Sequence, residues 1–306
     1  MTDPAFVPQT PPPTDTARLA NPQTLAAVHA ALRPHYQAIR ANDQQAREHY
    51  SPKGVHQLRV AARRLRAGFR LYRRDLATTP ARQLSERLRE LLAALGPARD
   101  ADVWMGRLRD RAVVGILSVH PEWPQVVAQE QKRRHRARAQ AEAYLASPPW
   151  QELLAQLELF FEHELPSTSA VPQLLLSPRT AKKLRRQLRA VVAEKKPLRQ
   201  RSADRIHDFR RECRKARYWA EYLVPVLGPT GEKLRKDLVA IADALGSMRD
   251  ADLAARKLAR RRCWWSERLR DRAEQQAAKA KRDFAQKWKR FRRELDEKSL
   301  RPAAPA

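Results

Sequence analysis

The feature that most restricts the fold of this chain is an internal repeat, because one histidine-led row of arginines occurs in each half. The segment VHQLRVAARRLRAGFRLY begins at Val55, and its counterpart IHDFRRECRKARYWAEYL begins at Ile206. When the two histidines are aligned, three arginine pairs also align: Arg59 with Arg210, Arg63 with Arg214, and Arg66 with Arg217. A chain built in this way is expected to fold as two related units.

A second motif follows the first at nearly the same spacing in both halves. The segments LGPARDAD, from Leu95, and LGSMRDAD, from Leu245, agree at six of eight positions. The aligned histidine and the arginine of this motif are 43 residues apart in the first copy and 42 in the second: His56 to Arg99, and His207 to Arg249. A composition rich in Arg and Ala does not explain two motifs in the same order at matched spacing, so they indicate a duplication.

The residues around the motifs favour helices throughout. The chain contains only 8 glycines, and Ala, Leu, Arg, Gln and Glu, which favour helices, dominate it. Several of its 22 prolines, such as Pro52 and Pro178, precede proline-free stretches and are placed to start helices. We therefore predict an all-α protein of two homologous helical bundles. The predicted segments are a disordered proline-rich lead over 1–20, bundles over 21–166 and 179–297, a linker over 167–178 and a disordered tail over 298–306.

Each histidine segment, placed on a helix, has one apolar stripe and one basic stripe. The apolar stripes recur at steps of three and four: Val55, Leu58, Ala62, Leu65, Phe69 and Tyr72, then Ile206, Phe209, Cys213, Ala216, Ala220 and Leu223. The basic stripes lie one position later, about 100° around the helix. They consist of His56, Arg59, Arg63, Arg66 and Arg70, then His207, Arg210, Arg214 and Arg217. Because the apolar stripe fixes each helix in its bundle, the basic stripe is expected to face a groove or the solvent.

A solvated helix face is the simpler explanation of an arginine stripe. Solvated faces usually mix charges of opposite sign at i, i+4, whereas these stripes place like charges at that spacing in both halves. We therefore interpret the stripes as an anion site, in which the planar fork of arginine pairs with phosphate oxygens. His56 and His207 are interpreted as further phosphate ligands, and a structural role in a bundle contact is the alternative.

The arginines of the second motif are expected to lie at the N-termini of helices. Gly96 and Gly246 fit as C-caps of preceding helices, so that Arg99 and Arg249 would open the next ones. Backbone N–H groups and the helix dipole favour anions at such positions. The aspartates of the motif either complement these N-termini or hold arginines of the stripes in place, and the sequence leaves both roles open. They are not included in the predicted site.

The motifs resemble the CHAD domain (conserved histidine α-helical domain) over about residues 21–297: His-x-x-Arg-x-x-x-Arg-Arg-x-Arg at 56–66, its degenerate copy at 207–217, and the two Leu-Gly-x-x-Arg-Asp-x-Asp segments. The resemblance implies two four-helix bundles related by pseudo-twofold symmetry, with a basic central pocket that binds inorganic polyphosphate. Some members of that family associate with polyphosphate granules. The copy departs from the pattern at Glu221, the counterpart of Arg70. Family members are often fused to a triphosphate tunnel domain, which nothing here resembles, so a stand-alone CHAD protein is expected.

The residues that the resemblance implies as phosphate ligands fall into two matched sets. The first-half set is His56, Arg59, Arg63, Arg64, Arg66 and Arg99, and the second-half set is His207, Arg210, Arg214, Lys215, Arg217 and Arg249.

The predicted function is non-catalytic binding of inorganic polyphosphate, which suits a net charge of +28. The alternative is a basic helical protein that binds nucleic acid non-specifically, because phosphate contacts dominate such binding. Against it, the seven tryptophans do not interleave with the basic stripes as base-stacking platforms would. An enzyme that processes phosphate chains is less favoured, because the stripes contain neither metal-binding carboxylates nor a nucleophile, and no Walker-type glycine loop or His-Glu-x-x-His motif occurs.

We predict no cofactor and no metal site. The two cysteines suit a reducing compartment, no apolar run approaches the roughly 20 residues that span a bilayer, and the N-terminus lacks a basic-then-apolar signal. The expected location is therefore cytoplasmic, with polyphosphate granules as the site that the resemblance implies, and no membrane partner is expected. The sequence does not indicate an oligomeric state.

Overall fold

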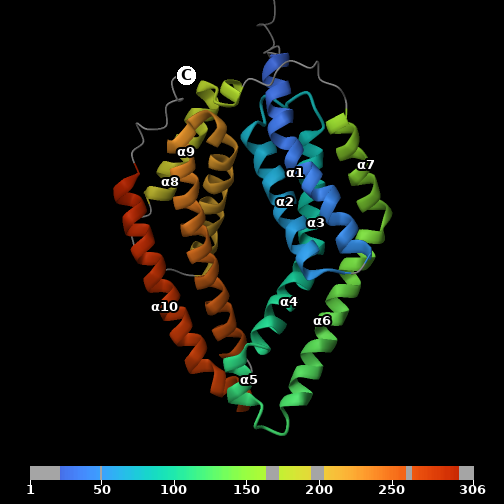
Figure 1. Cartoon of the computed structure of the whole chain (residues 1–306), viewed down its shortest axis with the longest axis vertical. Helices are drawn as coiled ribbons and strands as arrows, with labels where there is room; N and C mark the ends of the chain where they lie inside the picture. Colours follow the sequence, from blue (N-terminus) through green and yellow to red (C-terminus); the bar gives the residue numbers. More distant parts are fainter. Residues whose placement is uncertain (1–20, 49, 163–171, 194–202, 260–263, 296–306) are drawn as a thin grey trace, which may run out of the picture.

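The computed structural model describes residues 21–48, 50–162, 172–193, 203–259 and 264–295. Every regular element in these ranges is a helix, so the predicted all-α fold is confirmed (Figure 1). The elements are α1 (Pro22–Glu48), α2 (Pro52–Leu71), α3 (Ala81–Ala94), α4 (Gly96–Leu108), α5 (Arg111–Leu117), α6 (Trp123–Ala146), α7 (Pro148–Glu162), the 3-10 helix η1 (Pro172–Leu175), α8 (Pro178–Val192), α9 (Ala203–Ala259) and α10 (Trp264–Glu294).

Helices begin at Pro52 and at Pro178, as predicted, and a serine caps each of these two helices. Ser51 accepts a hydrogen bond from the backbone N–H of Gly54 at 3.1 Å, directly before Pro52 starts α2. Ser177 accepts one from the N–H of Thr180 at 3.2 Å, directly before Pro178 starts α8. A serine oxygen satisfies an N–H that has no partner inside the helix, while proline has no N–H to satisfy.

The prediction that Gly96 and Gly246 cap helices is wrong. Gly96 is the first residue of α4, and Leu95 is the C-cap of α3, whereas Gly246 lies inside α9. Among the described residues, the one positive φ is that of Gly228, 54°, where α9 is kinked between two prolines. Glycine is favoured there because a side chain would be strained.

The two copies of the second motif differ in structure because one contains a proline. Pro97 has no backbone N–H and lies at the start of α4, whereas Ser247 at the matching position leaves α9 unbroken. Arg249 was predicted to lie at a helix N-terminus. That prediction is wrong, because Arg249 lies within α9. Arg99 does lie near the start of α4, and its N–H donates to the carbonyl of Leu95 at 3.3 Å.

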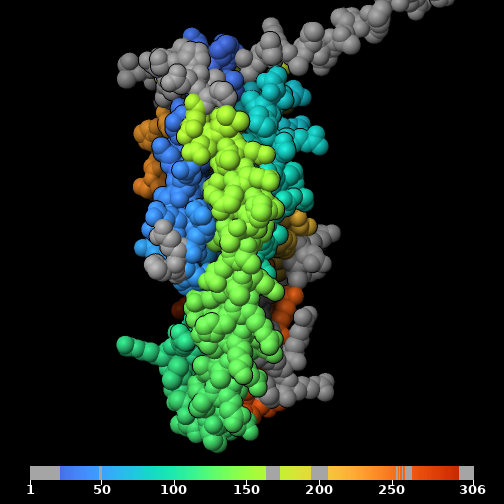
Figure 2. Space-filling view, turned by 90° about the vertical axis from the view of Figure 1, so that its right-hand side faces the viewer, coloured from blue at the N-terminus to red at the C-terminus, as the bar shows by residue number. Residues whose placement is uncertain are grey.

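The helices form two groups that stand side by side along the long axis, α1–α7 in one and α8–α10 in the other (Figure 1). Figure 2 shows α6 and α7 following one another along the outer face of the first group. Each group contains four long helical segments if the short α5 is left aside, α3 with α4 and α6 with α7 are each counted as one broken segment, and the kink at Gly228 divides α9 into two. The duplication of a four-helix bundle, and the domain boundaries, stay predictions; residues 1–20, 163–171 and 298–306 lie outside the described ranges.

The predicted apolar stripes lie in the core. On α2, the stripe from Val55 to Tyr72 is almost fully buried. On α9, the members of the apolar stripe from Phe209 to Leu223 are buried as well. Ile206, the first member of the second stripe, is only partly buried against this core. None of the helices in the described part of the chain has the length and apolar character needed to cross a membrane.

The two groups of helices contact each other in two places. Near one end, the Trp219 indole N–H donates to the carbonyl of Ala67 at 3.1 Å, and the Tyr222 hydroxyl donates to that of Arg64 at 2.9 Å. These bonds join α9 to α2. Near the other end, a separate apolar cluster that includes Trp104 and Leu269 packs α4 and α5 against α9 and α10. The N-terminal part of each basic stripe, His56 to Arg63 on α2 and His207 to Arg214 on α9, lies between these two contacts.

Candidate anion-binding cavity

A cavity of about 800 Å³ opens between α2 and α4 on one side and α9 on the other, and we call it the central cavity. Eight of the twelve predicted site residues line it, four from each half: His56, Arg59, Arg63 and Arg99, and His207, Arg210, Arg214 and Arg249. The structure therefore brings the N-terminal parts of both basic stripes, and the arginines of both second motifs, to one space. Whether these residues bind phosphate stays a prediction.

The arginines of the two halves are close enough to repel one another. The pKa of Arg214 is lowered to about 10, by burial first and then by repulsion from Arg210 and from Arg63 across the cavity. The pKa of Arg59 is also lowered to about 10, by burial first and then by repulsion from Arg63. Like charges held together away from water destabilise the empty cavity, so a bound anion would relieve them.

The two histidines share this environment. The pKa of His56 is lowered by burial first and then by Arg99, Arg63 and Arg59. The pKa of His207 is lowered in the same way, by burial and then by Arg249 and Arg214. Burial and the neighbouring guanidinium groups thus favour the neutral form of both imidazoles, and a bound anion would favour the charged form.

Arg59 and Arg210 occupy matching positions in the two repeats, and each lies near an aspartate of the second motif. Each has a buried Nε with no hydrogen-bond partner among the described residues. Arg59 donates from its guanidinium to the carbonyl of Leu92, which holds it against α3. Asp100 raises the pKa of Arg59, and Asp250 raises that of Arg210, so each half places one carboxylate near its buried arginine. This is the arrangement expected if the aspartates hold the arginines of the stripes.

The other aspartates of the second motif form ion pairs. Asp102 accepts from Arg134 at 2.7 Å and from Arg138 at 2.8 Å, both on α6, and its side chain is only 4% exposed. It therefore joins α4 to α6 rather than holding a stripe arginine. Asp252 pairs with Arg256 at 2.5 Å, and Arg256 lines the central cavity.

Four predicted site residues do not line the central cavity. Arg64 pairs with Glu221 at 2.9 Å, and Arg217 pairs with Glu221 at 3.0 Å and Asp243 at 3.4 Å. Arg66 donates to the carbonyl of Ser85 at 2.8 Å. Lys215 pairs with Glu212 at 3.5 Å and lies 4.9 Å from the centre of the Trp219 ring. Three of the four thus face a carboxylate, and the fourth faces a carbonyl.

Sequence reasoning missed several residues that line the central cavity. Arg107 and Arg256 add two guanidinium groups, Asp100 and Asp250 add carboxylates, and Trp104 adds an aromatic ring. A signal for the two arginines was present, because Arg107 follows Arg99 by eight residues and Arg256 follows Arg249 by seven, which places each about two helical turns further along.

No metal site is evident in the described ranges. They contain no group of three or more His, Cys, Asp or Glu side chains arranged to hold a metal ion. The absence of a cofactor stays a prediction.

Polyphosphate binding is expected to strengthen as the pH falls through and below the ordinary histidine pKa of about 6.5. In the free protein the pKa values of His56 and His207 are lowered, and a bound phosphate chain would raise them. Binding then takes up protons, so affinity rises between the bound and the free pKa values, by up to about tenfold per pH unit for each histidine. Calorimetric titrations over this range measure it.

The double variant His56→Gln and His207→Gln is the control for this pH dependence. Its affinity should change less with pH than that of the unaltered protein, which separates the histidines from the titration of the phosphate chain itself. If the affinity of the unaltered protein depends on pH in the same way as that of the variant, the two histidines have a structural role and are not phosphate ligands.

Comparison with known proteins places this arrangement among characterised folds. A scan against protein-family models matches residues 30–259 to the CHAD domain. The chain is similar to the crystal structure of the CHAD domain from the plant Ricinus communis, at 22% identity and a TM-score of 0.62, covering 94% of this chain and 93% of that one. It is also similar to PptA from Streptomyces chartreusis, at 19% identity and a TM-score of 0.66, covering 87% of this chain and 99% of that one. No curated protein matches it.

Proposed function

The chain belongs to the CHAD domain family, and on this premise we propose that it binds inorganic polyphosphate in the central cavity without catalysing a reaction on it. The observation on which the proposal rests is the meeting of two histidine-led arginine rows, one from α2 and one from α9, around one space. We propose the cytoplasm, at polyphosphate granules, as the place where this binding occurs, in line with the resemblance to that family.

A phosphate chain without organic groups suits the central cavity better than a ligand that is recognised through its organic groups. Stripe residues one turn apart rise about 5 Å along a helix, so that a row of guanidinium groups can follow a linear chain of phosphates. Each arginine can donate two parallel hydrogen bonds to phosphate oxygens and keeps its charge at neutral pH. The repulsion among Arg63, Arg210 and Arg214 supports the proposal further, because an anion between them would remove it.

Competition between long polyphosphate and duplex DNA tests the ligand class. At physiological salt, and with both ligands compared per unit charge, polyphosphate should displace DNA, because duplex DNA holds its phosphates on a rigid cylinder that enters a cavity poorly. Fluorescence anisotropy of labelled DNA with unlabelled polyphosphate as competitor measures this. If DNA wins per unit charge, the central cavity is not the main anion site and non-specific nucleic-acid binding becomes the better account.

The absence of catalysis is also a proposal. The carboxylates that line the central cavity, Asp100 and Asp250, each lie near an arginine whose pKa they raise, and we propose that they serve to hold these arginines. The purified protein should release no phosphate from polyphosphate in the presence of Mg²⁺ or Mn²⁺. Release that scales with protein concentration and is lost in a variant of Asp100 or Asp250 would overturn this part of the proposal.

A further inference from the structure

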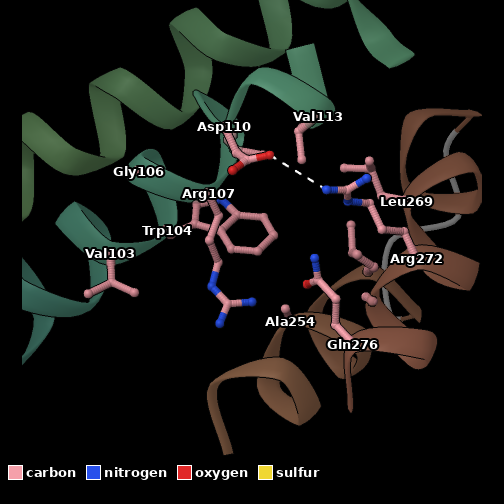
Figure 3. A pocket seen from close by; sticks show the side chains of 13 residues that line it. Val103, Trp104, Gly106, Arg107, Asp110, Val113, Ala254, Leu269, Arg272 and Gln276 are labelled. Carbon is pink, nitrogen blue, oxygen red and sulfur yellow. Dashed lines mark ion pairs between the residues drawn. The ribbon is translucent and has the colours of Figure 1, made fainter. Parts of the chain in front are cut away.

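A second pocket, of about 340 Å³, lies beside the central cavity, between α4 and α5 on one side and α9 and α10 on the other (Figure 3). We call it the annex. Most of its walls are apolar, and several of these residues are buried in the cluster that joins the two groups of helices, among them Leu108, Leu258 and Leu269. Its volume lies within the range of about 300–1,000 Å³ that is typical of pockets for small organic molecules.

The annex and the central cavity are adjacent and share part of their lining. Four residues line both of them: Val103, Trp104, Arg107 and Ala254. In Figure 3, Arg107 reaches from α4 toward Ala254 beside the ring of Trp104. Arg107 forms no ion pair with any residue in the described part of the chain, so its guanidinium at this boundary is available to an anion. A single molecule could therefore occupy both spaces.

The two spaces differ in chemistry. The central cavity is lined chiefly by arginines, which suit phosphate. In the annex, Asp110 pairs with Arg272 at 3.7 Å, which reduces the net charge available to a ligand there. The ring of Trp104 faces the middle of the annex, and the Gln276 amide lies on the opposite wall (Figure 3). A bare phosphate would lose hydration in this place without compensation, whereas an aromatic ring could stack on the indole and hydrogen-bond to the amide.

We propose that the annex binds the base of a nucleoside polyphosphate whose phosphate chain lies in the central cavity, with Arg107 contacting the phosphate at the boundary. This inference rests on the proposed function, because it requires the cavity to bind phosphate. It extends the ligand class from a bare phosphate chain to a phosphate chain that bears an aromatic group. The apolar annex would then have a use beyond joining the two groups of helices.

Titration calorimetry with adenosine 5′-triphosphate and with inorganic triphosphate, both without divalent metal, tests the inference. The nucleotide carries fewer negative charges than inorganic triphosphate, so charge alone predicts weaker binding of the nucleotide. Stacking of one base on an aromatic side chain should instead make the nucleotide bind about tenfold more tightly. In Trp104→Leu this advantage should disappear, so that the nucleotide no longer binds more tightly than inorganic triphosphate.

A second variant covers the case in which Trp104→Leu fails to fold, since Trp104 is buried. Gly106 lines the annex, and a Cβ built on it meets nothing within 4 Å, so Gly106→Leu introduces a side chain at the annex from a position where its Cβ has space. It should reduce nucleotide affinity to that for inorganic triphosphate. The matched control is Gly115→Leu on α5, where a Cβ also meets nothing and which does not line the annex. This control should keep the nucleotide's advantage.

The outcomes separate this inference from the proposed function. If adenosine triphosphate binds no more tightly than inorganic triphosphate, or if Gly106→Leu leaves its advantage intact, the annex is not a base site. Long polyphosphate that still binds under those conditions leaves the proposed function standing. If neither triphosphate nor long polyphosphate binds, both the inference and the proposed function are wrong.

Discussion

Replacing Arg63 and Arg214 together by glutamate is expected to weaken polyphosphate binding by at least about a hundredfold, because the charge where the two stripes meet falls by about four units as two positive groups become negative. Arg63 comes from α2 and Arg214 from α9, and both line the central cavity. Repulsion by Arg63 contributes to the lowered pKa of Arg214, so the two guanidinium groups lie close enough to act on one anion. Calorimetry or anisotropy with long polyphosphate measures the loss.

The same double variant should keep its helical circular dichroism and should not unfold earlier. Neither arginine forms an ion pair with a described residue, and the change replaces repulsion with attraction to Arg210. A matched control is Arg82→Glu with Arg292→Glu, which changes the net charge equally at two exposed positions outside the cavity, one in each half. The control should lose little affinity. Equal losses in both variants would show that overall charge, rather than the cavity, determines binding.

The sequence was sufficient to predict the inner part of each basic stripe. The apolar stripe from Val55 to Tyr72 repeats with the helical period and is buried, so the direction of its neighbour, one position later, followed from geometry. His56, Arg59 and Arg63 accordingly line the cavity, as do His207, Arg210 and Arg214. The repetition in two halves added information that one helix could not give, because it indicated that two rows of basic residues serve one ligand.

The position of Arg64 outside the cavity could not be predicted, because its partner comes from the other half of the chain. Arg64 on α2 pairs with Glu221 on α9, 157 residues away in sequence. Glu221 also pairs with Arg217 on its own helix. The sequence alignment identified Glu221 as the counterpart of Arg70 and treated it as a defect in the pattern. In the structure it is a carboxylate that neutralises two arginines where α2 and α9 touch.

The break between α3 and α4 shows a second limit of the sequence pattern. Leu95–Arg99 and Leu245–Arg249 match at three of five positions, and glycine in both copies suggested the same cap. The decisive difference is Pro97 against Ser247, because only serine can donate a backbone N–H to continue the helix. Arg249 still lines the cavity from inside α9. Arg249 reaches the cavity because it lies on the face of α9 that lines it, and not because it lies at a helix N-terminus.

Gly68→Ala is expected to destabilise the fold by about 3 kcal/mol, near the upper end of the cost of overpacking a core. Gly68 lies on α2 where α9 crosses it. A Cβ at this position would collide with the Leu32 side chain and would lie 2.7 Å from the ring and the hydroxyl of Tyr222. Neither neighbour can move easily, because both are buried and the Tyr222 hydroxyl donates to the carbonyl of Arg64 at 2.9 Å. Thermal unfolding should therefore shift to lower temperature by several degrees.

The same variant tests whether the α2–α9 contact sets the width of the central cavity. Arg63 lies little more than one helical turn before Gly68, so α2 cannot move away from α9 without displacing it. Affinity for polyphosphate should fall in Gly68→Ala, measured well below its unfolding temperature. Gly115→Ala is the control, because a Cβ there meets nothing, and alanine should stabilise the exposed helix by up to about 1 kcal/mol. An unchanged unfolding temperature in Gly68→Ala would contradict the packing described between the two halves. A lowered one with full affinity would mean that the cavity holds its shape through the contact of α4 and α5 with α10.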